Sequence, residues 1–334
     1  MTVNRVFENF TDCYLSLASE IMGCYDYECA PRGQKIREKL GIKFEITDPR
    51  QRMLYIPQRK FSVQYMIAEF LWYLSGNDST EWISNYSSFW KKISDDGKTA
   101  NSAYGARIFK SHPRIAGSQL IQWNHTIKEL KKDPDSRRAI IHIKSPWDTA
   151  QAKLDVPCTL ALQFFVRDGK VDVVVNMRSS DLILGIAYDV PAFTFLQELM
   201  ALELGMDVGR YIHISNSLHI YEKHFGMVEK FLQPVEMQES RLYQVSCGKF
   251  PKLSELPKIK ELMLFEEALQ NAQCYEDVCD SVNELSIMDC NDINYWLDWG
   301  KILASHRLMK LELKDKAKIM QNSTSYVGYH QRGK

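Results

Sequence analysis

The distribution of apolar and polar residues predicts a pair of strands near the middle of the chain. Residues 158–166 (CTLALQFFV) and 171–177 (VDVVVNM) are apolar and β-rich, and residues 167–169 form a glycine-containing turn between them. Two strands joined by such a turn bring their far ends together, so Cys158 and Arg178 are predicted neighbours. Further strands are expected at 43–47 (KFEIT), 139–143 (AIIHI) and 210–221 (RYIHISNSLHIY).

Other segments carry apolar residues at helical spacing. In residues 62–76 the apolar positions are Met66, Ile67, Phe70, Leu71 and Leu74, which lie on one face of a helix. Further helices are expected in 1–31, 118–132, 191–205, 258–272 and 293–318. Residues 82–108 are irregular and rich in aromatic side chains, as expected of a loop that supplies a binding wall. Strands and helices together predict an α/β (α+β) fold with a large mixed sheet flanked by helices.

Composition and length restrict the possible partners and the domain organisation. The 334 residues include 42 basic and 42 acidic side chains, so charge does not favour binding to duplex DNA or an anionic membrane. No apolar run of eighteen residues is present, and the N-terminal segment is too acidic for a signal peptide. The length fits one large domain, placed at 1–245, and a helical extension at 246–334.

The eight cysteines are scattered without a paired framework, which predicts reduced thiols in a cytoplasmic protein. Cys274 and Cys279 lack nearby histidines, so no metal site is expected there. A thiol beside the guanidinium of Arg178 would ionise more readily and be a better nucleophile. The alternative for Cys158 is a buried core residue, the common state of a lone cysteine in an apolar strand.

Glu69 lies at the edge of the apolar face of the predicted helix 62–76. A carboxylate there is costly unless it faces a wet cleft or finds a partner. It is therefore a candidate catalytic residue, with a glutamate on the helix surface as the alternative.

Several sequence motifs, in a fixed order along the chain, resemble the motifs of a known family. They are PCTLALQFFV (157–166), NMRSSDLILG (176–185), YDVPAF (188–193) and SNSLHIYEKHF (215–225). They resemble the thymidylate synthase superfamily, whose members have a Pro-Cys nucleophile, a Gln-Phe pair, an Arg-Ser-x-Asp motif and a His-x-Tyr. The resemblance extends from Arg32 to Phe225 and stops after about Phe231. It is strongest to the phage deoxycytidylate hydroxymethylases, through DPDSRR, the Cys-Thr pair, VVNMRS and SLH.

The resemblance implies roles for individual residues. The implied catalytic residues are Cys158, Glu69 and Asp189. The implied nucleotide-binding residues are Arg32, Arg137, Arg138, Gln163, Arg178, Ser179, Ser180, His219 and Tyr221, with Arg37 as an alternative to Arg32. The implied residues for the co-substrate 5,10-methylenetetrahydrofolate are Trp90, Tyr104, Asp181 and Gly185. Family members are homodimers in which an arginine pair crosses to the partner's phosphate site, and apolar surface on the strands near Cys158 also favours a dimer.

The implied reaction begins with addition of the Cys158 thiolate to C6 of a pyrimidine, which makes C5 nucleophilic toward the folate one-carbon unit. Glu69 manages protons through ordered water. Methylating enzymes have asparagine where this chain has Asp189, and histidine where it has Thr159. A carboxylate can accept from the cytosine amino group and a protonated N3, so we expect dCMP as substrate and 5-hydroxymethyl-dCMP as product.

The sequence leaves alternatives open for the substrate, the functional class and the role of the C-terminal extension. The polar C-terminus GYHQRGK differs from the short apolar end that closes methylating enzymes over the folate. CMP, or dUMP with a hydroxymethyl or methyl product, is an alternative substrate. A binding protein without catalytic activity and an assembly component of a nucleotide-synthesising complex are alternatives from other functional classes. The C-terminal extension is expected to be a helical cap, a dimer element or a partner-binding module.

Overall fold

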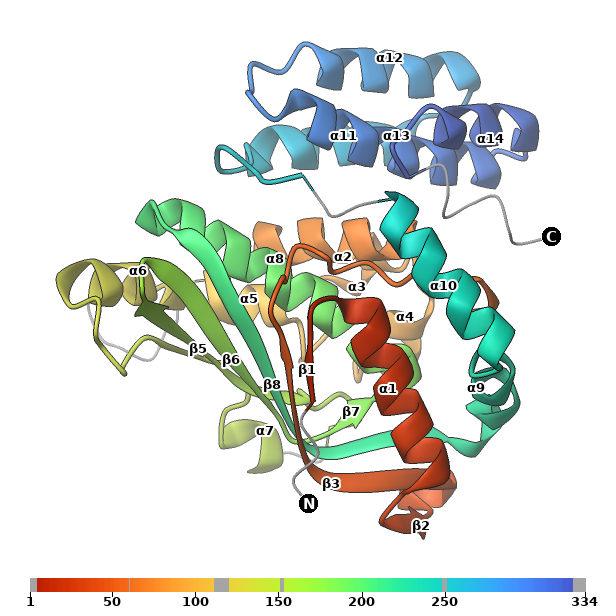
Figure 1. The fold of residues 1–334 in the computed structure, drawn as a ribbon. Coiled ribbons are helices and arrows are strands. Elements are labelled where there is room, and N and C mark those ends of the chain that lie inside the picture. Colours follow the sequence, from red (N-terminus) through yellow and green to blue (C-terminus); the bar gives the residue numbers. More distant parts are fainter. Residues whose placement is uncertain (1–4, 60, 111–119, 151–152, 248–250, 327–334) are drawn as a thin grey trace.

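The computed structural model describes residues 5–59, 61–110, 120–150, 153–247 and 251–326. In this part of the chain the centre is a mixed sheet of eight strands in the order β1-β3-β8-β6-β5-β4, with β2 paired to β3 and β7 to β8 (Figure 1). The strands are β1 (Val6–Phe7), β2 (Tyr27–Cys29), β3 (Ile36–Ile46), β4 (Ile140–His142), β5 (Thr159–Arg167), β6 (Lys170–Met177), β7 (Ser180–Asp181) and β8 (Asp207–Tyr221). The expected large mixed sheet is confirmed.

β5 and β6 form the predicted antiparallel hairpin. Asp168 and Gly169 have φ angles of 50° and 71°, the left-handed pair that a tight two-residue turn requires. The register pairs Thr159 with Met177 at the far end. The next residues, Cys158 and Arg178, are therefore adjacent, and the Arg178 backbone N–H donates to the Cys158 carbonyl over 2.9 Å.

Helices cover the sheet and carry the site residues between them. In the described residues they are α1 (Phe10–Gly23), α2 (Val63–Ser75), α3 (Thr80–Ile83), α4 (Phe89–Ile93), α5 (Tyr104–Phe109), α6 (Gln122–Lys132), α7 (Trp147–Ala150), α8 (Ala187–Leu204), α9 (Phe225–Phe231), α10 (Pro234–Cys247), α11 (Ile259–Asn271), α12 (Tyr275–Ser286), α13 (Ile293–Lys310) and α14 (Lys314–Asn322). Short turns of other helix types are η1 (Pro31–Gly33), η2 (Pro57–Arg59), η3 (Leu182–Ile186, a π-helix) and η4 (Glu222–His224).

Helix α2 begins and ends at the residues that its sequence indicates. The Ser62 side chain accepts from the Tyr65 backbone N–H, and Gly76 ends the helix with φ 65°. Helix α8 is apolar on all sides because it lies between the sheet and α2 (Figure 1). Phe195 on α8 stacks on Phe70 of α2, with ring centroids 4.8 Å apart.

Among the described residues, one stretch is long and apolar enough to cross a membrane. It is Leu182–Leu204, with a mean hydropathy of 1.3, and 78% of its most apolar window is buried inside the protein. The core helix of a globular protein passes the same test of length and composition. Its burial against the sheet and α2 accounts for its apolar composition.

The C-terminal helices form a layer over α2 and α8, on the side away from the sheet (Figure 1). The Trp299 ring of α13 lies 5.4 Å from Phe70 and 5.4 Å from Phe195, centroid to centroid. Glu198 on α8 pairs with buried Arg52 and also accepts from the Leu253 backbone N–H over 3.1 Å. The extension thus shares a continuous hydrophobic core with the rest of the chain.

Three expectations about local structure need correction. The first helix covers only Phe10–Gly23, because the segment after it pairs as β2 with β3. Residues 82–108 are not simply irregular, since they contain the short helices α3, α4 and α5. The extension contains α12 in addition to the expected helical segments. β2 depends on pairing with β3, whereas α12 has a capping box and buried residues at helical spacing in its own sequence.

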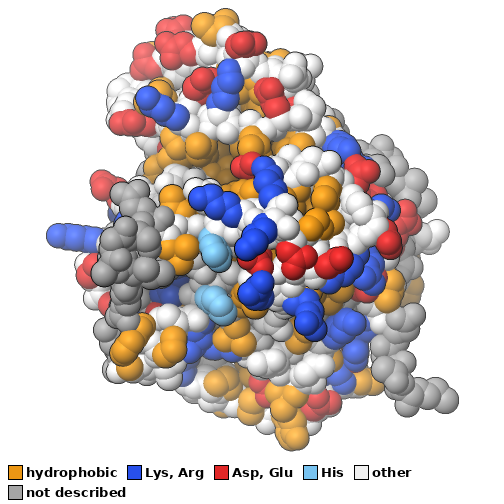
Figure 2. Space-filling model, turned by 90° about the vertical axis from the view of Figure 1, so that its left-hand side faces the viewer, with side chains coloured by type: hydrophobic (Ala, Val, Ile, Leu, Met, Phe, Trp, Pro, Cys, Tyr) orange, Lys and Arg blue, Asp and Glu red, His pale blue; other side chains and the backbone are white. Residues whose placement is uncertain are grey.

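Figure 2 shows the molecule turned by 90° from Figure 1, with the C-terminal helices at the top. Orange apolar side chains gather beneath these helices, and basic, acidic and histidine side chains are interspersed over the face below them. The balanced charges of the chain are thus mixed on this face.

Candidate active site

A cavity of about 490 Å³ opens where β3 begins and β8 ends. Its lining residues are Pro31, Arg32, Ile36, Glu38, Lys153, Leu154, Val156, Arg178, Ser179, Ser217, His219 and Tyr221. The cavity brings together five of the residues expected to bind nucleotide, namely Arg32, Arg178, Ser179, His219 and Tyr221.

The lining of the cavity carries three cationic side chains, Arg32, Lys153 and Arg178, and one carboxylate, Glu38. Lys153 also donates to the Asn101 side chain over 2.9 Å. Guanidinium groups suit a phosphate because their donors match its oxygens. The cation excess therefore fits a phosphate-bearing ligand.

Arg32 and Arg37 are the two candidates for the N-terminal arginine that binds the substrate phosphate. Arg32 lies in η1 with φ 52°, a strained conformation for a residue with a side chain, and lines the cavity. The Arg37 side chain instead donates hydrogen bonds to the Glu28 carboxylate over 3.0 Å and to the Met22 carbonyl over 3.1 Å. The geometry favours Arg32.

Cys158 lies at the end of the hairpin, half-buried, beside the Arg178 guanidinium. Arg178 donates to the carbonyls of Pro157 and Val156, each over 2.9 Å, and its Nη2 is 3.5 Å from Sγ of Cys158. Burial raises the pKa of the Cys158 thiol, and Arg178 offsets this only in part. The expectation of a net more acidic thiol is therefore wrong for the unliganded protein.

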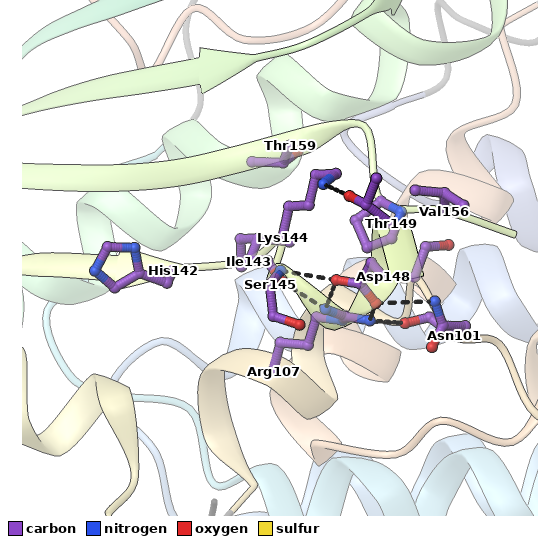
Figure 3. Close-up of polar contacts among 12 residues, drawn as sticks. Asn101, Arg107, His142, Ile143, Lys144, Ser145, Asp148, Thr149, Val156 and Thr159 are labelled. Carbon is purple, nitrogen blue, oxygen red and sulfur yellow. Dashed lines mark hydrogen bonds and ion pairs between the residues drawn. The ribbon is translucent and has the colours of Figure 1, made fainter. Parts of the chain in front are cut away.

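A buried ion pair fixes the loop that leads to Cys158 (Figure 3). Arg107 forms two hydrogen bonds of 2.7 Å to the Asp148 carboxylate, and Asp148 also accepts from the Ser145 backbone N–H. Burial opposes ionisation of Asp148, but these donors lower its pKa to about 2. Asn101 continues the network to the Asp155 carbonyl at 2.9 Å, three residues before Cys158.

Glu69 faces inward from α2 and is only 5% exposed. The Tyr65 hydroxyl donates to its Oε1 over 2.8 Å, and the Trp90 indole N–H donates to the Tyr65 oxygen over 3.1 Å. Burial raises the pKa of Glu69 to about 8, an effect that Tyr65 opposes and nearby Asp189 reinforces. A carboxyl group with such a pKa can take up or release a proton near neutral pH.

Asp189 lies in the first turn of α8 and is half-buried. Burial, followed by the negative charge of Asp181, raises the pKa of Asp189 to about 7. Asp181 itself caps η3 by accepting from the Ile183 backbone N–H over 2.8 Å. A Cβ at Gly185 would lie only 3.2 Å from Oδ2 of Asp189. The glycine in η3 therefore leaves room for the Asp189 carboxylate.

His219 and Tyr221 lie on one face of β8, as predicted, with ring centroids 5.2 Å apart. Burial lowers the pKa of His219, which favours the neutral imidazole. Its Nδ1 is buried and has no hydrogen-bond partner among the described residues. A ligand hydroxyl in the cavity could satisfy this atom.

Several expected site residues lie outside the cavity lining. Arg137 and Arg138 are exposed in the turn before β4, where Arg138 pairs with Glu129 at 3.2 Å. Gln163 donates to the Arg137 carbonyl over 2.8 Å, and Ser180 is buried with its hydroxyl 3.5 Å from His213. Within this subunit none of these four residues lines the cavity, although Ser180 follows Ser179 and pairs with Leu218 next to His219.

Two of the four residues expected at the folate are aromatic, and we call this pair, Trp90 and Tyr104, the aromatic wall. Tyr104 and Trp90 are buried, and the Tyr104 hydroxyl accepts from the Thr159 backbone N–H over 3.3 Å. Leu184, beside Gly185, is a large apolar side chain that is 49% exposed. Neither aromatic ring lines the described cavity, so their place at the folate stays a prediction.

The raised pKa of Glu69 gives a stability prediction. Its usual pKa is 4.5, so folding favours the protonated form, and this contribution is lost as pH rises from about 4.5 through about 8. We expect Glu69→Gln to stabilise the unliganded protein by about 2 to 3 kcal/mol at pH 7 in urea unfolding. At pH 4 the gain should nearly vanish, and an equal gain at both pH values would contradict the assignment.

Comparison with known proteins places the chain in a family. The profile described as thymidylate synthase matches residues 12–254. The chain belongs to the thymidylate synthase family. A deoxyuridylate hydroxymethyltransferase of Bacillus phage SP01 is 32% identical over 223 residues, 65% of this chain. The match spans 58% of that relative's length. Family similarity therefore extends further than the range from Arg32 to Phe225 that the motifs indicated.

The sequence motifs did not identify four residues that the site contains. Glu38, Lys153 and Ser217 line the cavity, and the Ser217 hydroxyl donates to Glu38. Tyr65 contacts Glu69 from one turn earlier in α2. Of these four residues only Tyr65 could have been recognised in the sequence, because residues four apart, such as Tyr65 and Glu69, share a helix face.

Proposed function

We propose that this family member transfers a one-carbon unit from 5,10-methylenetetrahydrofolate to C5 of a pyrimidine nucleoside monophosphate. The observation that carries the proposal is the position of Cys158 beside Arg178, whose side chain lines the cavity together with Arg32, Ser179 and the His219–Tyr221 pair. A nucleophile, an anion site and a site for a sugar hydroxyl are thereby joined.

Each residue has a defined task in this proposal. Arg32 and Arg178 bind the phosphate and Ser179 adds a donor, while His219 and Tyr221 bind the 3′-hydroxyl. The Cys158 sulfur, deprotonated, adds to C6 of the base, and Glu69 exchanges protons with the base through water. Methylenetetrahydrofolate, bound by Trp90, Tyr104, Asp181 and Gly185, supplies the one-carbon unit.

We favour dCMP as substrate because of Asp189. With a pKa of about 7, this group is available as a carboxylate that accepts from the cytosine amino group and from protonated N3. Thr159 beside the nucleophile supports the same choice. The second candidate is dUMP, supported by the name of the phage relative, since a neutral Asp189 carboxyl could pair with uracil.

A hydroxymethyl product is favoured over a methyl product. The phage relative's name supports hydroxymethyl transfer. The polar C-terminal segment GYHQRGK, which also motivated this choice, lies outside the described residues. Water that reaches the activated carbon before hydride would give the hydroxymethyl group.

One assay tests the proposal and its alternatives together. The enzyme is incubated with methylenetetrahydrofolate and C5-tritiated dCMP, CMP or dUMP, tritium release is followed, and the product is weighed by mass spectrometry. We expect release from dCMP and a product heavier by one hydroxymethyl group. Methylated dUMP with dihydrofolate would make the protein a thymidylate synthase, and no release from any nucleotide would refute the proposed transfer.

We also propose a homodimer in which Arg137 and Arg138 complete the partner's phosphate site. Both side chains are exposed and lie outside the cavity of their own subunit. Exposed guanidinium groups outside their own cavity are placed where they could reach a ligand bound by a second subunit. In the cytoplasm, where we expect the enzyme, nucleotide and folate are its small-molecule partners.

Subunit mixing tests the shared site. Cys158→Ser and the double variant Arg137→Ala/Arg138→Ala should each be inactive alone. After unfolding and refolding together, half of the dimers are mixed and each has one intact site, so about one quarter of wild-type activity should return. Each variant refolded alone is the control. Absence of recovery, or a monomer in sedimentation equilibrium, would contradict the shared site.

A further inference from the structure

Glu69 is held by a hydrogen-bonded chain that reaches the aromatic wall of the site. The chain runs from the Trp90 indole on α4 to the Tyr65 hydroxyl on α2 and on to Oε1 of Glu69, over 3.1 and 2.8 Å. Tyr65 thus receives one hydrogen bond and donates another, which fixes the direction of its O–H. The second oxygen of Glu69, Oε2, has no hydrogen-bond partner among the described residues.

Packing restricts Tyr65 to this position. Its ring meets Tyr188 of α8 edge to face, with centroids 4.8 Å apart and planes at 90°. Tyr188 is itself stacked on Phe61 at 4.9 Å and accepts from the Ser62 backbone N–H over 3.2 Å. A phenol locked in this way cannot turn its hydroxyl away from Glu69 without losing both contacts.

We propose that Tyr65 is a positioning residue for Glu69, which ties one carboxylate oxygen to the Trp90 wall and leaves the other oxygen for proton exchange with substrate. The inference rests on the proposed function, because it assigns Glu69 the proton transfers of that reaction. Tyr65 then links Trp90 of the aromatic wall, where we expect the folate, to the proton-transfer group Glu69. A change in the position of Trp90 would be transmitted to Glu69 through Tyr65.

The charges around Glu69 give the direction of the expected effect. Tyr65 and Tyr73 on its own helix and Asp189 on α8 are the titratable groups that interact with it. The Tyr65 hydroxyl stabilises the ionised carboxylate, whereas Asp189 disfavours it. Removal of this hydroxyl therefore raises the pKa of Glu69, and a base that must be ionised then works only at higher pH.

The test compares Tyr65→Phe with Tyr73→Phe by carboxyl ¹³C NMR titration of Glu69 in the unliganded protein, assigned through Glu69→Gln. We expect the Glu69 titration to move up by about one pH unit in Tyr65→Phe. The matched Tyr73→Phe removes the same hydroxyl from the same helix, two turns later, and should leave the titration nearly unchanged. Trp90→Phe should move it in the same direction as Tyr65→Phe but less.

Activity supplies a second readout. The acidic limb of the kcat profile for tritium release should move up by the same amount in Tyr65→Phe, with the KM for nucleotide nearly unchanged. Equal NMR shifts in the two tyrosine variants, or no shift in either, would overturn the role of Tyr65. No tritium release from wild type would refute the proposed function separately, because the NMR titration does not depend on activity.

Discussion

Cys158→Ser is expected to lower turnover by about 10³-fold or more while leaving nucleotide binding largely intact. A serine hydroxyl is far less ionised than a thiol and cannot form the covalent adduct at C6. The proposed phosphate and sugar contacts rest on Arg32, Arg178 and His219, which line the cavity and which the substitution does not remove. Tritium release measures the chemical step, and isothermal titration with dCMP measures binding.

The matched control is Cys279→Ser on α12, which lies in the C-terminal extension. It should retain nearly full activity, because the extension packs on α2 and α8 away from the nucleotide cavity. A Cys158→Ser enzyme that keeps more than about a hundredth of wild-type activity would rule out covalent catalysis at this residue.

Asp189→Asn is expected to reverse the choice of base. An asparagine amide can donate to uracil O4 and accept from N3–H, whereas we propose that the wild-type aspartate pairs with cytosine. Buried polar groups that are mismatched with a substrate can discriminate by about 10⁴-fold, so kcat/KM for dCMP should fall steeply and that for dUMP should rise. Competition between the two nucleotides in one assay measures the ratio directly.

The pH dependence of this preference supplies an internal control. Because the pKa of Asp189 is about 7, wild-type preference for dCMP over dUMP should strengthen as pH rises through 7 and the carboxyl ionises. Asparagine does not titrate, so the variant's preference should stay flat over the same range. An unchanged preference in Asp189→Asn would mean that another residue recognises the base.

The fold was largely predictable from local pattern. The turn at Asp168 and Gly169 between two apolar segments predicted the hairpin and the meeting of Cys158 with Arg178. Helix α2 followed from its apolar face together with Ser62 and Gly76 at its ends. Period-two spacing placed His219 and Tyr221 on one face of β8. These features depend on residues close in sequence, where geometry is set by the chain itself.

Other features depend on contacts between distant segments and could not be read in advance. The sequence could not show that Lys153 and Glu38 face one cavity, because they belong to segments more than a hundred residues apart. It suggested an acidic Cys158 thiol from its neighbour Arg178, but the effect of burial is larger. It left the extension open as a helical cap, a dimer element or a partner-binding module, and it did not show that Trp299 packs on Phe70 and Phe195.

The sequence by itself thus determined the hairpin, helix α2 and the residue types that can carry out the chemistry. Tertiary structure decided their electrostatics: Glu69 and Asp189 acquire pKa values of about 8 and 7 because folding removes them from water. It also decided that Tyr65 and Trp90 meet beside Glu69. Burial and long-range packing are properties of the whole assembled core, so no local pattern of residues encodes them.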